Sequence, residues 1–320
     1  MRIAMLFVLM LFEASLCAAA DVYPDKSVRV VVPFAPGGSV DTTARVISQQ
    51  LTEQLGKPFI VDNRTGASGT IGNAIVAKSA PDGYTLMMAD TSTAIAGSLY
   101  KSLPFDVAKD FSAITEIMRA PQVLVINAST NANTLREFVA LAQANPGKFN
   151  YGSAGSGGAL HLTAELFKMA AKVNIVHVPF KGGSDAIVAL MNGDTHMQIS
   201  TLPTVFAAIK SGKARALAVT SDGKRLPAIP NVPSMGEGGV PNMVVYVWYG
   251  LVGPAGMPKK LVSTLNAEAI KATAVPSVKE RFIAQGAEVV GSSPEDFTKY
   301  IRSELQRWTA VIKAAGVTPE

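Results

Sequence analysis

Two glycine-rich segments have the composition of anion-binding loops. Residues 33–41 (PFAPGGSVD) contain adjacent Gly37 and Gly38 and precede apolar residues at helical spacing. Residues 151–161 (YGSAGSGGALH) repeat this arrangement with glycines and hydroxyl side chains. Glycine lets backbone N–H groups approach a ligand closely, and the start of the following helix adds unpaired donors and a positive dipole end. Two such loops from opposing parts of a fold would close on one small carboxylate.

Within these loops, two residues have competing interpretations. Asp41 is expected to stabilise the first turn of its helix, with direct ligand contact as the alternative. His161 lies one turn into the helix after the second loop, where it either reaches the ligand or ties the loop backbone. The candidate ligand-binding residues of both loops are Phe34, Ala35, Gly37, Gly38, Asp41, Ser153, Ala154, Gly155, Ser156, Gly157 and His161.

Two shorter loops also follow expected strands. Thr91 and Ser92 offer hydroxyl groups after the strand at 85–88, and we include both as candidate ligand contacts. Lys181 follows the strand at 175–178 and is a candidate source of positive potential, although a solvated surface lysine is the commoner case.

The motifs of nucleotide-binding proteins and serine hydrolases match these loops poorly. A dinucleotide fingerprint would need a small residue where Leu160 stands, and no Walker lysine follows the loop. The Gly-x-Ser-x-Gly elbow is degenerate at Ser156, which leaves an exported serine hydrolase using Ser156 and His161 as the alternative function. The sequence has no His-x-x-x-His motif and no paired carboxylates, so we expect no metal and no cofactor.

Composition excludes several classes of protein. The 320 residues are 48% hydrophobic and only 17% charged, which excludes a disordered chain and leaves material for a large core. The net charge of +5 is scattered, so nucleic acid is not an expected partner. A weak attraction for small anions fits this charge better.

The first twenty residues resemble a secretory signal. Arg2 precedes a ten-residue apolar run, and 18–20 (AAA) form a small-residue cleavage pattern, so we expect export to the periplasm with cleavage after Ala20. Cys17 would suggest a lipid anchor, but Leu16 stands where that signal requires a small residue. Cleavage would remove the only cysteine, which excludes disulfides and thiolate metal sites.

After residue 20, short β-branched runs alternate with amphipathic helical segments, a pattern typical of parallel α/β units. No flexible linker separates the two halves. We therefore predict a two-lobed α/β fold with crossover strands, in which lobe 1 comprises 21–122 and 245–320 and lobe 2 comprises 123–244. In open α/β sheets, ligands bind beyond the carboxyl ends of the strands.

Several segments in order resemble the Bug-type substrate-binding proteins of tripartite tricarboxylate transporters. They span essentially the whole mature chain and are 33–41, 62–69, 80–85, 151–161, 178–182, 215–220 and 253–258. The resemblance implies a monomeric periplasmic receptor with a type II-like Venus-flytrap architecture. Such a receptor captures a small amino-acid, di- or tricarboxylic or aromatic acid and passes it to a membrane permease.

The resemblance also implies roles for particular residues. In that family the segments matching 34–38 and 153–157 hold one ligand carboxylate, partly through ordered waters. The sequence departs from the family at 94–97 (AIAG) and lacks an acidic residue near Thr201. In that family both regions face the variable end of the ligand, which places Thr201 among the candidates and leaves the ligand's identity open. A receptor that signals through a sensor, without feeding a permease, is a further alternative.

Overall fold

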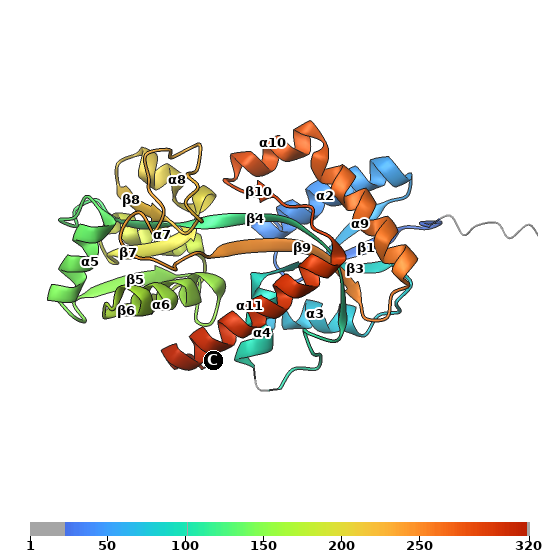
Figure 1. Ribbon diagram of the computed structural model, residues 1–320, viewed down its shortest axis with the longest axis horizontal. Coiled ribbons are helices and arrows are strands. Elements are labelled where there is room, and N and C mark those ends of the chain that lie inside the picture. The colour runs from blue at the N-terminus through green and yellow to red at the C-terminus, as the bar shows by residue number, and fades with distance from the viewer. Residues whose placement is uncertain (1–22, 101, 319–320) are drawn as a thin grey trace, which may run out of the picture.

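The computed structural model describes residues 23–100 and 102–318, so the expected signal segment lies outside the described residues. The chain forms two α/β halves placed side by side (Figure 1). One sheet order runs through both of them, β2-β1-β3-β9-β4-β7-β5-β6, with β8 and β10 paired to β4.

The first half contains three parallel strands, each followed by a helix or helical turn. Its crossover strand β9 is antiparallel to β3. The elements are β1 (Val28–Val32), α2 (Ser39–Leu55), β2 (Phe59–Asn63), η1 (Ala67–Gly69), α3 (Thr70–Ala77), β3 (Thr85–Asp90), α4 (Thr91–Leu99), β9 (Tyr246–Pro254), α9 (Lys259–Ala274), α10 (Pro276–Ala284) and β10 (Glu288–Val289).

The second half repeats this order with different strands. In it β5 pairs in parallel with β6 and β7, and β4 lies antiparallel between β7 and β8. The elements are β4 (Phe111–Asn127), α5 (Leu135–Ala144), β5 (Phe149–Ser153), α6 (Ala159–Ala171), β6 (Ile175–Pro179), α7 (Gly183–Asn192), β7 (Met197–Thr201), α8 (Leu202–Lys210) and β8 (Ala214–Val219). The two-lobed α/β fold expected from the sequence is confirmed.

The long strand β4 belongs to both halves. Residues 111–121 pair with β9, whereas 122–127 pair with β7 and β8. The sequence predicted a strand only from Val123, so the first twelve residues of β4 are an addition. The chain returns after β8, where Val245 N donates to Thr220 O at 3.0 Å before β9 begins.

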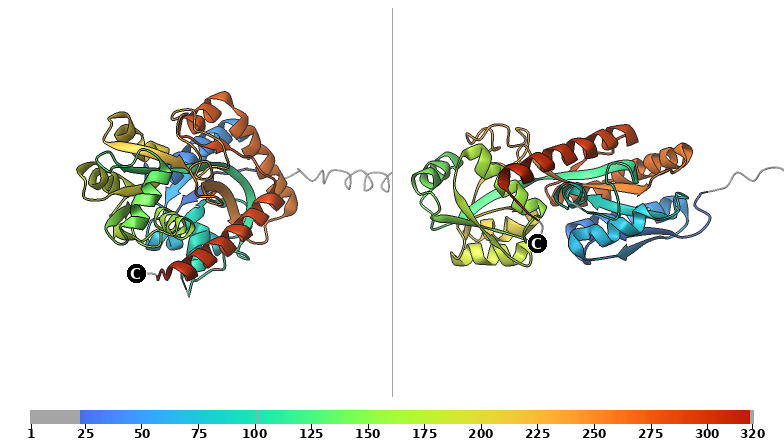
Figure 2. Two further views of the ribbon diagram at one scale, coloured as in Figure 1. Left: turned by 60° about the vertical axis from the view of Figure 1, so that its left-hand side comes forward. Right: turned by 90° about the horizontal axis from the view of Figure 1, so that it is seen from below.

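The C-terminal helix α11 (Pro294–Ala315) also joins the halves. It packs against β4 and α4 and reaches α6 of the second half, and Figure 2 shows it crossing the molecule. Ser293 caps the helix by accepting a hydrogen bond from Asp296 N at 3.1 Å. Phe297 and Trp308 on its inner face are fully buried, and these residues belong to a hydrophobic cluster that also contains side chains of both halves.

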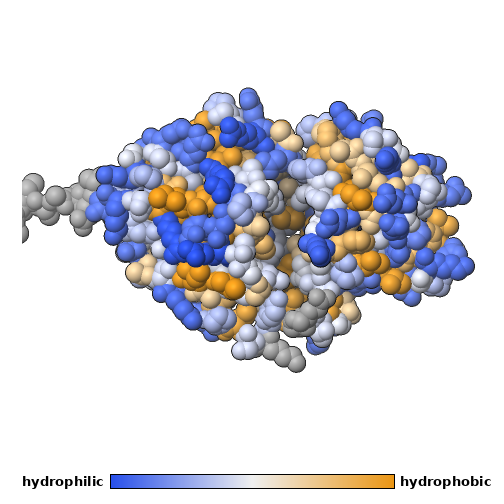
Figure 3. Space-filling view, turned by 180° about the vertical axis from the view of Figure 1, so that it is seen from behind, coloured by the Kyte–Doolittle hydropathy of each residue, from blue (hydrophilic) through white to orange (hydrophobic). Residues whose placement is uncertain are grey.

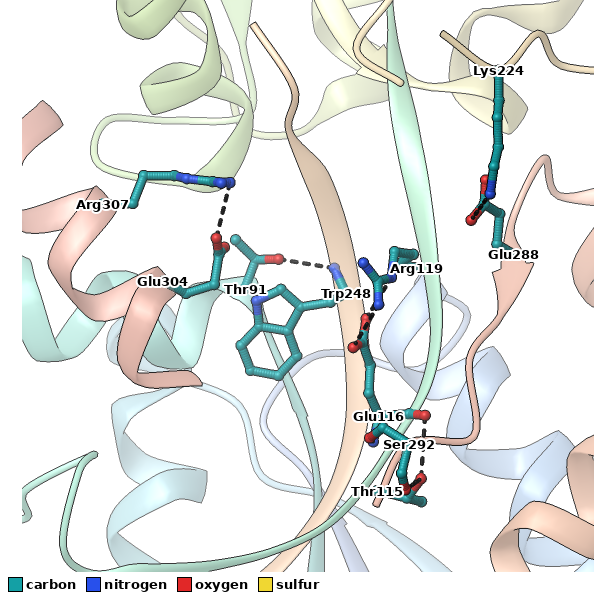
Figure 4. Close-up of polar contacts among 10 residues, drawn as sticks. All are labelled: Thr91, Thr115, Glu116, Arg119, Lys224, Trp248, Glu288, Ser292, Glu304 and Arg307. Carbon is teal, nitrogen blue, oxygen red and sulfur yellow. Dashed lines mark hydrogen bonds and ion pairs between the residues drawn. The ribbon is translucent and has the colours of Figure 1, made fainter. Parts of the chain in front are cut away.

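Polar contacts fix the region where the strands cross (Figure 4). Arg119 pairs with Glu116 on β4 at 3.0 Å, and Arg307 pairs with Glu304 on α11 at 2.9 Å. Burial raises the pKa of Glu116 to about 7, although Arg119 opposes this shift. Each pair lies within one element and joins a buried carboxylate to a partly exposed guanidinium group, so each keeps a buried charge from being left without a partner.

Seen from behind, the surface is hollowed between the two halves (Figure 3). Within the described residues, no helix combines the length and apolar character needed to cross a membrane.

Candidate functional site

A cavity of about 400 Å³ lies where the carboxyl ends of the parallel strands of both halves meet. Residues from the first turns of five helices, α2, α4, α6, α7 and α8, line it, at least one from each. These residues include Ser39, Ser92, Ala159, Gly183 and Thr204. Because a helix N-terminus carries unpaired N–H groups and a partial positive charge, this convergence favours a bound anion. We call this cavity the cleft.

The loop after β1 is held from behind by Asp41. The Asp41 carboxylate accepts hydrogen bonds from Gly37 N, Arg45 Nε and Asn63 Nδ2, each at 2.9 Å. Burial alone would raise the pKa of Asp41, but these hydrogen bonds outweigh it and lower the pKa. Asp41 is therefore a support for the loop, and the Gly37 amide is occupied by this carboxylate.

The loop after β5 is supported by two histidines. Gly157 N donates to His161 Nδ1 at 2.9 Å, which identifies Nδ1 as the acceptor nitrogen. The His161 ring stacks on that of His177, with centroids 3.9 Å apart, and His177 Nε2 lies 2.6 Å from Ser153 Oγ. The ring of His161 thus ties the loop backbone, one of the two roles considered from the sequence.

A buried polar network continues this support away from the cleft. Tyr151 OH donates to Glu165 Oε1 at 2.5 Å, and Lys168 Nζ donates to the same oxygen at 2.7 Å. Tyr151 also stacks on His177, at 4.9 Å between centroids. The second loop therefore rests on a layered arrangement of rings and charges, which keeps its amides fixed before a ligand arrives.

The structure brings several sequence-predicted residues into the cleft lining. They are Phe34, Ser92, Ala154, Gly155, Ser156, Gly157, His161 and Thr201. The remaining candidates lie outside the lining, namely Ala35, Gly37, Gly38, Asp41, Thr91, Ser153 and Lys181.

Physical reasons place these remaining residues elsewhere. Thr91 is buried, and its Oγ1 accepts a hydrogen bond from the backbone N–H of Trp248 at 3.0 Å (Figure 4). Ser153 is buried and donates to Gly155 O at 2.9 Å, within its own loop. Lys181 is exposed to solvent, as the commoner interpretation of its position anticipated.

Sequence reasoning missed a polar corner of the cleft. Tyr249 OH on β9 donates to Ser39 Oγ at 2.9 Å, and Asp90 at the end of β3 lies opposite Tyr249 in the strand register. All three residues line the cleft. The position of Asp90 directly before Thr91 and Ser92, at the carboxyl end of a strand, was the available signal. Ser184 and Ser200 were missed as well.

A larger cavity of about 620 Å³ lies elsewhere, between residues 221–227 and 270–291. Lys224 and Glu288 on its wall form an ion pair at 3.1 Å (Figure 4). Arg225 and Lys279 also line it, and the rest of its wall is mostly aliphatic, without a glycine loop at a helix N-terminus. We therefore assign ligand binding to the smaller cleft. Among the described residues, no group of three or more His, Cys, Asp or Glu side chains could hold a metal ion.

Two α/β halves around a cleft ringed by helix N-termini define the class of periplasmic solute-binding proteins. Comparison with known families narrows this class. Residues 43–317 match the model of the tripartite tricarboxylate transporter family receptors, TctC, and the chain belongs to this family. The Bug-type resemblance seen in the sequence is thereby confirmed. The family is one of periplasmic solute-binding proteins.

Relatives support the assignment at the level of sequence and structure. The chain is 37% identical to the protein BugT of Bordetella pertussis, covering 93% of this chain and 92% of BugT. A Rhodopseudomonas palustris protein with adipate superposes with a TM-score of 0.82 at 34% identity, covering 93% of this chain and all of that one. MatC from the same organism, with bound malate, gives a TM-score of 0.78 at 31% identity, covering 91% of this chain and all of MatC.

Proposed function

We propose that this protein captures a small organic carboxylate in the cleft and delivers it to the membrane permease of a tripartite transporter. The observation that carries this proposal is the convergence of five helix N-termini on a cleft whose described lining contains no lysine or arginine. Backbone amides and hydroxyl groups supply the attraction for the carboxylate in place of cationic side chains. The relatives with adipate and malate support the ligand class.

The proposed carboxylate site is the loop at 153–158 with the first turn of α6. Ala154, Gly155 and Ser156 line the cleft there, and His161 and Ser153 hold the loop from behind. Phe34 and Ser39 face this loop from the first half. We retain Thr201 as a contact to the variable end of the ligand.

We also propose the lobe boundaries at 122/123 and 244/245. Their support is the change of pairing partners within β4 between residues 121 and 122, and the start of β9 at Tyr246. Export with cleavage after Ala20 and a monomeric state complete the proposal. They are checked by mass spectrometry of the periplasmic protein and by its mass in solution.

Thermal unfolding of the purified mature protein against a panel of carboxylates, including adipate and malate, tests the function. A ligand at about 100 times its dissociation constant should add roughly 2.7 kcal/mol to the free energy of unfolding. Stabilisation by no carboxylate in the panel would contradict the proposal.

The Gly155→Val variant tests whether the ligand binds at the loop at 153–158. Gly155 has a φ of +103° and lines the cleft, so a branched side chain there both strains the loop and covers its amides. Affinity should fall at least tenfold, as measured by titration calorimetry.

Gly212→Val is the matched control for this variant. Gly212 has a comparable φ of +71°, with open space around it, and lies outside the cleft lining. It carries a similar backbone cost and should leave affinity unchanged. Equal affinities in both variants would remove the loop at 153–158 from the site.

A further inference from the structure

Asp90 is an acidic residue in a cleft that otherwise suits an anion. It is the last residue of β3 and immediately precedes α4. Asp90 belongs to the cleft lining, although the residue is only 6% exposed. On the neighbouring strand β9, Tyr249 lies directly opposite in the register and also lines the cleft.

The carboxylate of Asp90 is only partly satisfied by the protein. Asp90 Oδ2 accepts a hydrogen bond from Ser92 Oγ at 3.1 Å. Asp90 Oδ1 is buried and has no hydrogen-bond partner among the described residues. Buried polar atoms nearly always have a partner, because leaving one unpaired costs free energy.

No cationic side chain of the described cleft lining balances the negative charge of Asp90. The described lining includes no lysine or arginine, and its other titratable side chains are Tyr100, His161 and Tyr249. Burial raises the pKa of Asp90 to about 6, so the group is mostly ionised at neutral pH. The Ser92 side chain and the backbone N–H groups of Ser92 and Thr93, at the start of α4, oppose this shift by favouring the ionised form. Asp90 Oδ1 nevertheless has no hydrogen-bond partner among the described residues.

These features discriminate between possible ligands. A dicarboxylate would bring its second negative charge into a cleft that already holds one, where the low dielectric strengthens repulsion. A ligand with a protonated amine would instead complete the hydrogen bonding of Oδ1 and neutralise the charge.

We propose that Asp90 binds an ammonium group of the ligand and selects amino acids over the matching acids without an amine. This inference rests on the proposed function, since the ligand's carboxylate is held by the loop at 153–158. It names the substrate class as an acid that carries one amine.

Matched ligand pairs test the proposal on the intact mature protein. The pairs are glutamate and glutarate, aspartate and succinate, and 4-aminobutyrate and butyrate, each measured by titration calorimetry at pH 7.5. In at least one pair the amino acid should bind tighter by about 10- to 100-fold, the range expected for a hydrogen bond to a charged group.

Asp90→Asn should abolish this preference while retaining binding of the deaminated partner, since asparagine keeps the size and the capping ability of aspartate. Asp185→Asn is the matched control. Asp185 is also acidic and lies in the first turn of a helix, α7, but it is exposed and outside the lining, so the preference should persist.

The outcomes separate this inference from the proposed function. Binding of the deaminated acids with equal or higher affinity than the amino acids in every pair would overturn the role of Asp90 alone. A preference that survives in Asp90→Asn would overturn it as well. Failure of all carboxylates to bind would overturn the proposed function. If Asp90→Asn does not fold, the ligand pairs on the unchanged protein still decide.

Discussion

At the scale of single residues, Asp90 is the residue whose proposed role in ligand binding most directly lowers the stability of the fold. A buried carboxylate with one unpaired oxygen costs free energy of folding, and packing alone gives no reason to retain it. Its pKa is raised by burial from 3.8 to about 6. A raised pKa means that the folded state holds the proton more tightly than the unfolded state does. The group therefore favours folding below about pH 4, and this contribution is lost as the pH rises through 6.

Asp90→Asn should accordingly raise the free energy of unfolding at pH 7.5, by on the order of 2 to 3 kcal/mol. At pH 4 the variant and the unchanged protein should differ little. Urea denaturation at the two pH values measures both differences. A variant that is less stable at pH 7.5 would show that the carboxylate is satisfied in the folded protein.

Asp41 shows the opposite behaviour among the residues that support the cleft. Its pKa is lowered because hydrogen bonds from Arg45, Gly37 and Asn63 outweigh burial. A lowered pKa contributes stability above the unfolded value near 4, and that stability is lost as the pH falls through the folded value. Asp41→Ala should cost about 1 to 3 kcal/mol at pH 7, with a smaller cost at pH 3, in the same denaturation assay. An equal cost at both pH values would argue against the charged contacts.

At the scale of elements, the parallel strand-helix units and the presence of crossover strands were predictable, but the full length of β4 was not. The run from Val28 to Val32 and the glycine loop after it identify a strand and a turn by local chemistry alone. The start of β4 at Phe111 escaped prediction because its sequence mixes polar residues with Pro121, which local propensity disfavours in a strand. Its pairing is decided by β9, which comes from a distant part of the chain.

The same limit applies to the elements that form the cleft. The loop at 153–158 carries its own signal in glycines and hydroxyls, and the structure places it in the lining. Tyr249 carries a weaker signal, because an aromatic residue in an apolar strand packs in the core more often than it lines a cleft. Only the strand register brings Tyr249 beside Asp90, and sequence reasoning without coordinates has no access to that register.

At the scale of the whole molecule, the two halves touch across the cleft. A Cβ added at Gly157, in the loop before α6, would lie 2.6 Å from Leu99 Cδ2 at the end of α4. Gly157 also has a φ of +75°, which favours glycine. The absence of a side chain at Gly157 therefore permits the close approach of the two halves that a closed receptor needs.

Gly157→Ala should weaken ligand binding by about five- to thirtyfold, because overpacking of this kind costs about 1 to 2 kcal/mol. Leu99→Ala in the same chain should restore part of the loss, and a double-mutant cycle of affinities measures this coupling. Additive effects of the two substitutions would show that the halves do not meet at this point in the bound state.

The most direct test of the whole account is a crystal structure of the mature protein with a bound small carboxylate. We expect the ligand's carboxylate within hydrogen-bond distance of the backbone N–H groups at 154–156, because Gly157 N already donates to His161. Where the ligand has an amine, we expect it at Asp90. A ligand seated in the larger cavity beside Lys224 and Glu288, or held by cationic side chains, would contradict the account.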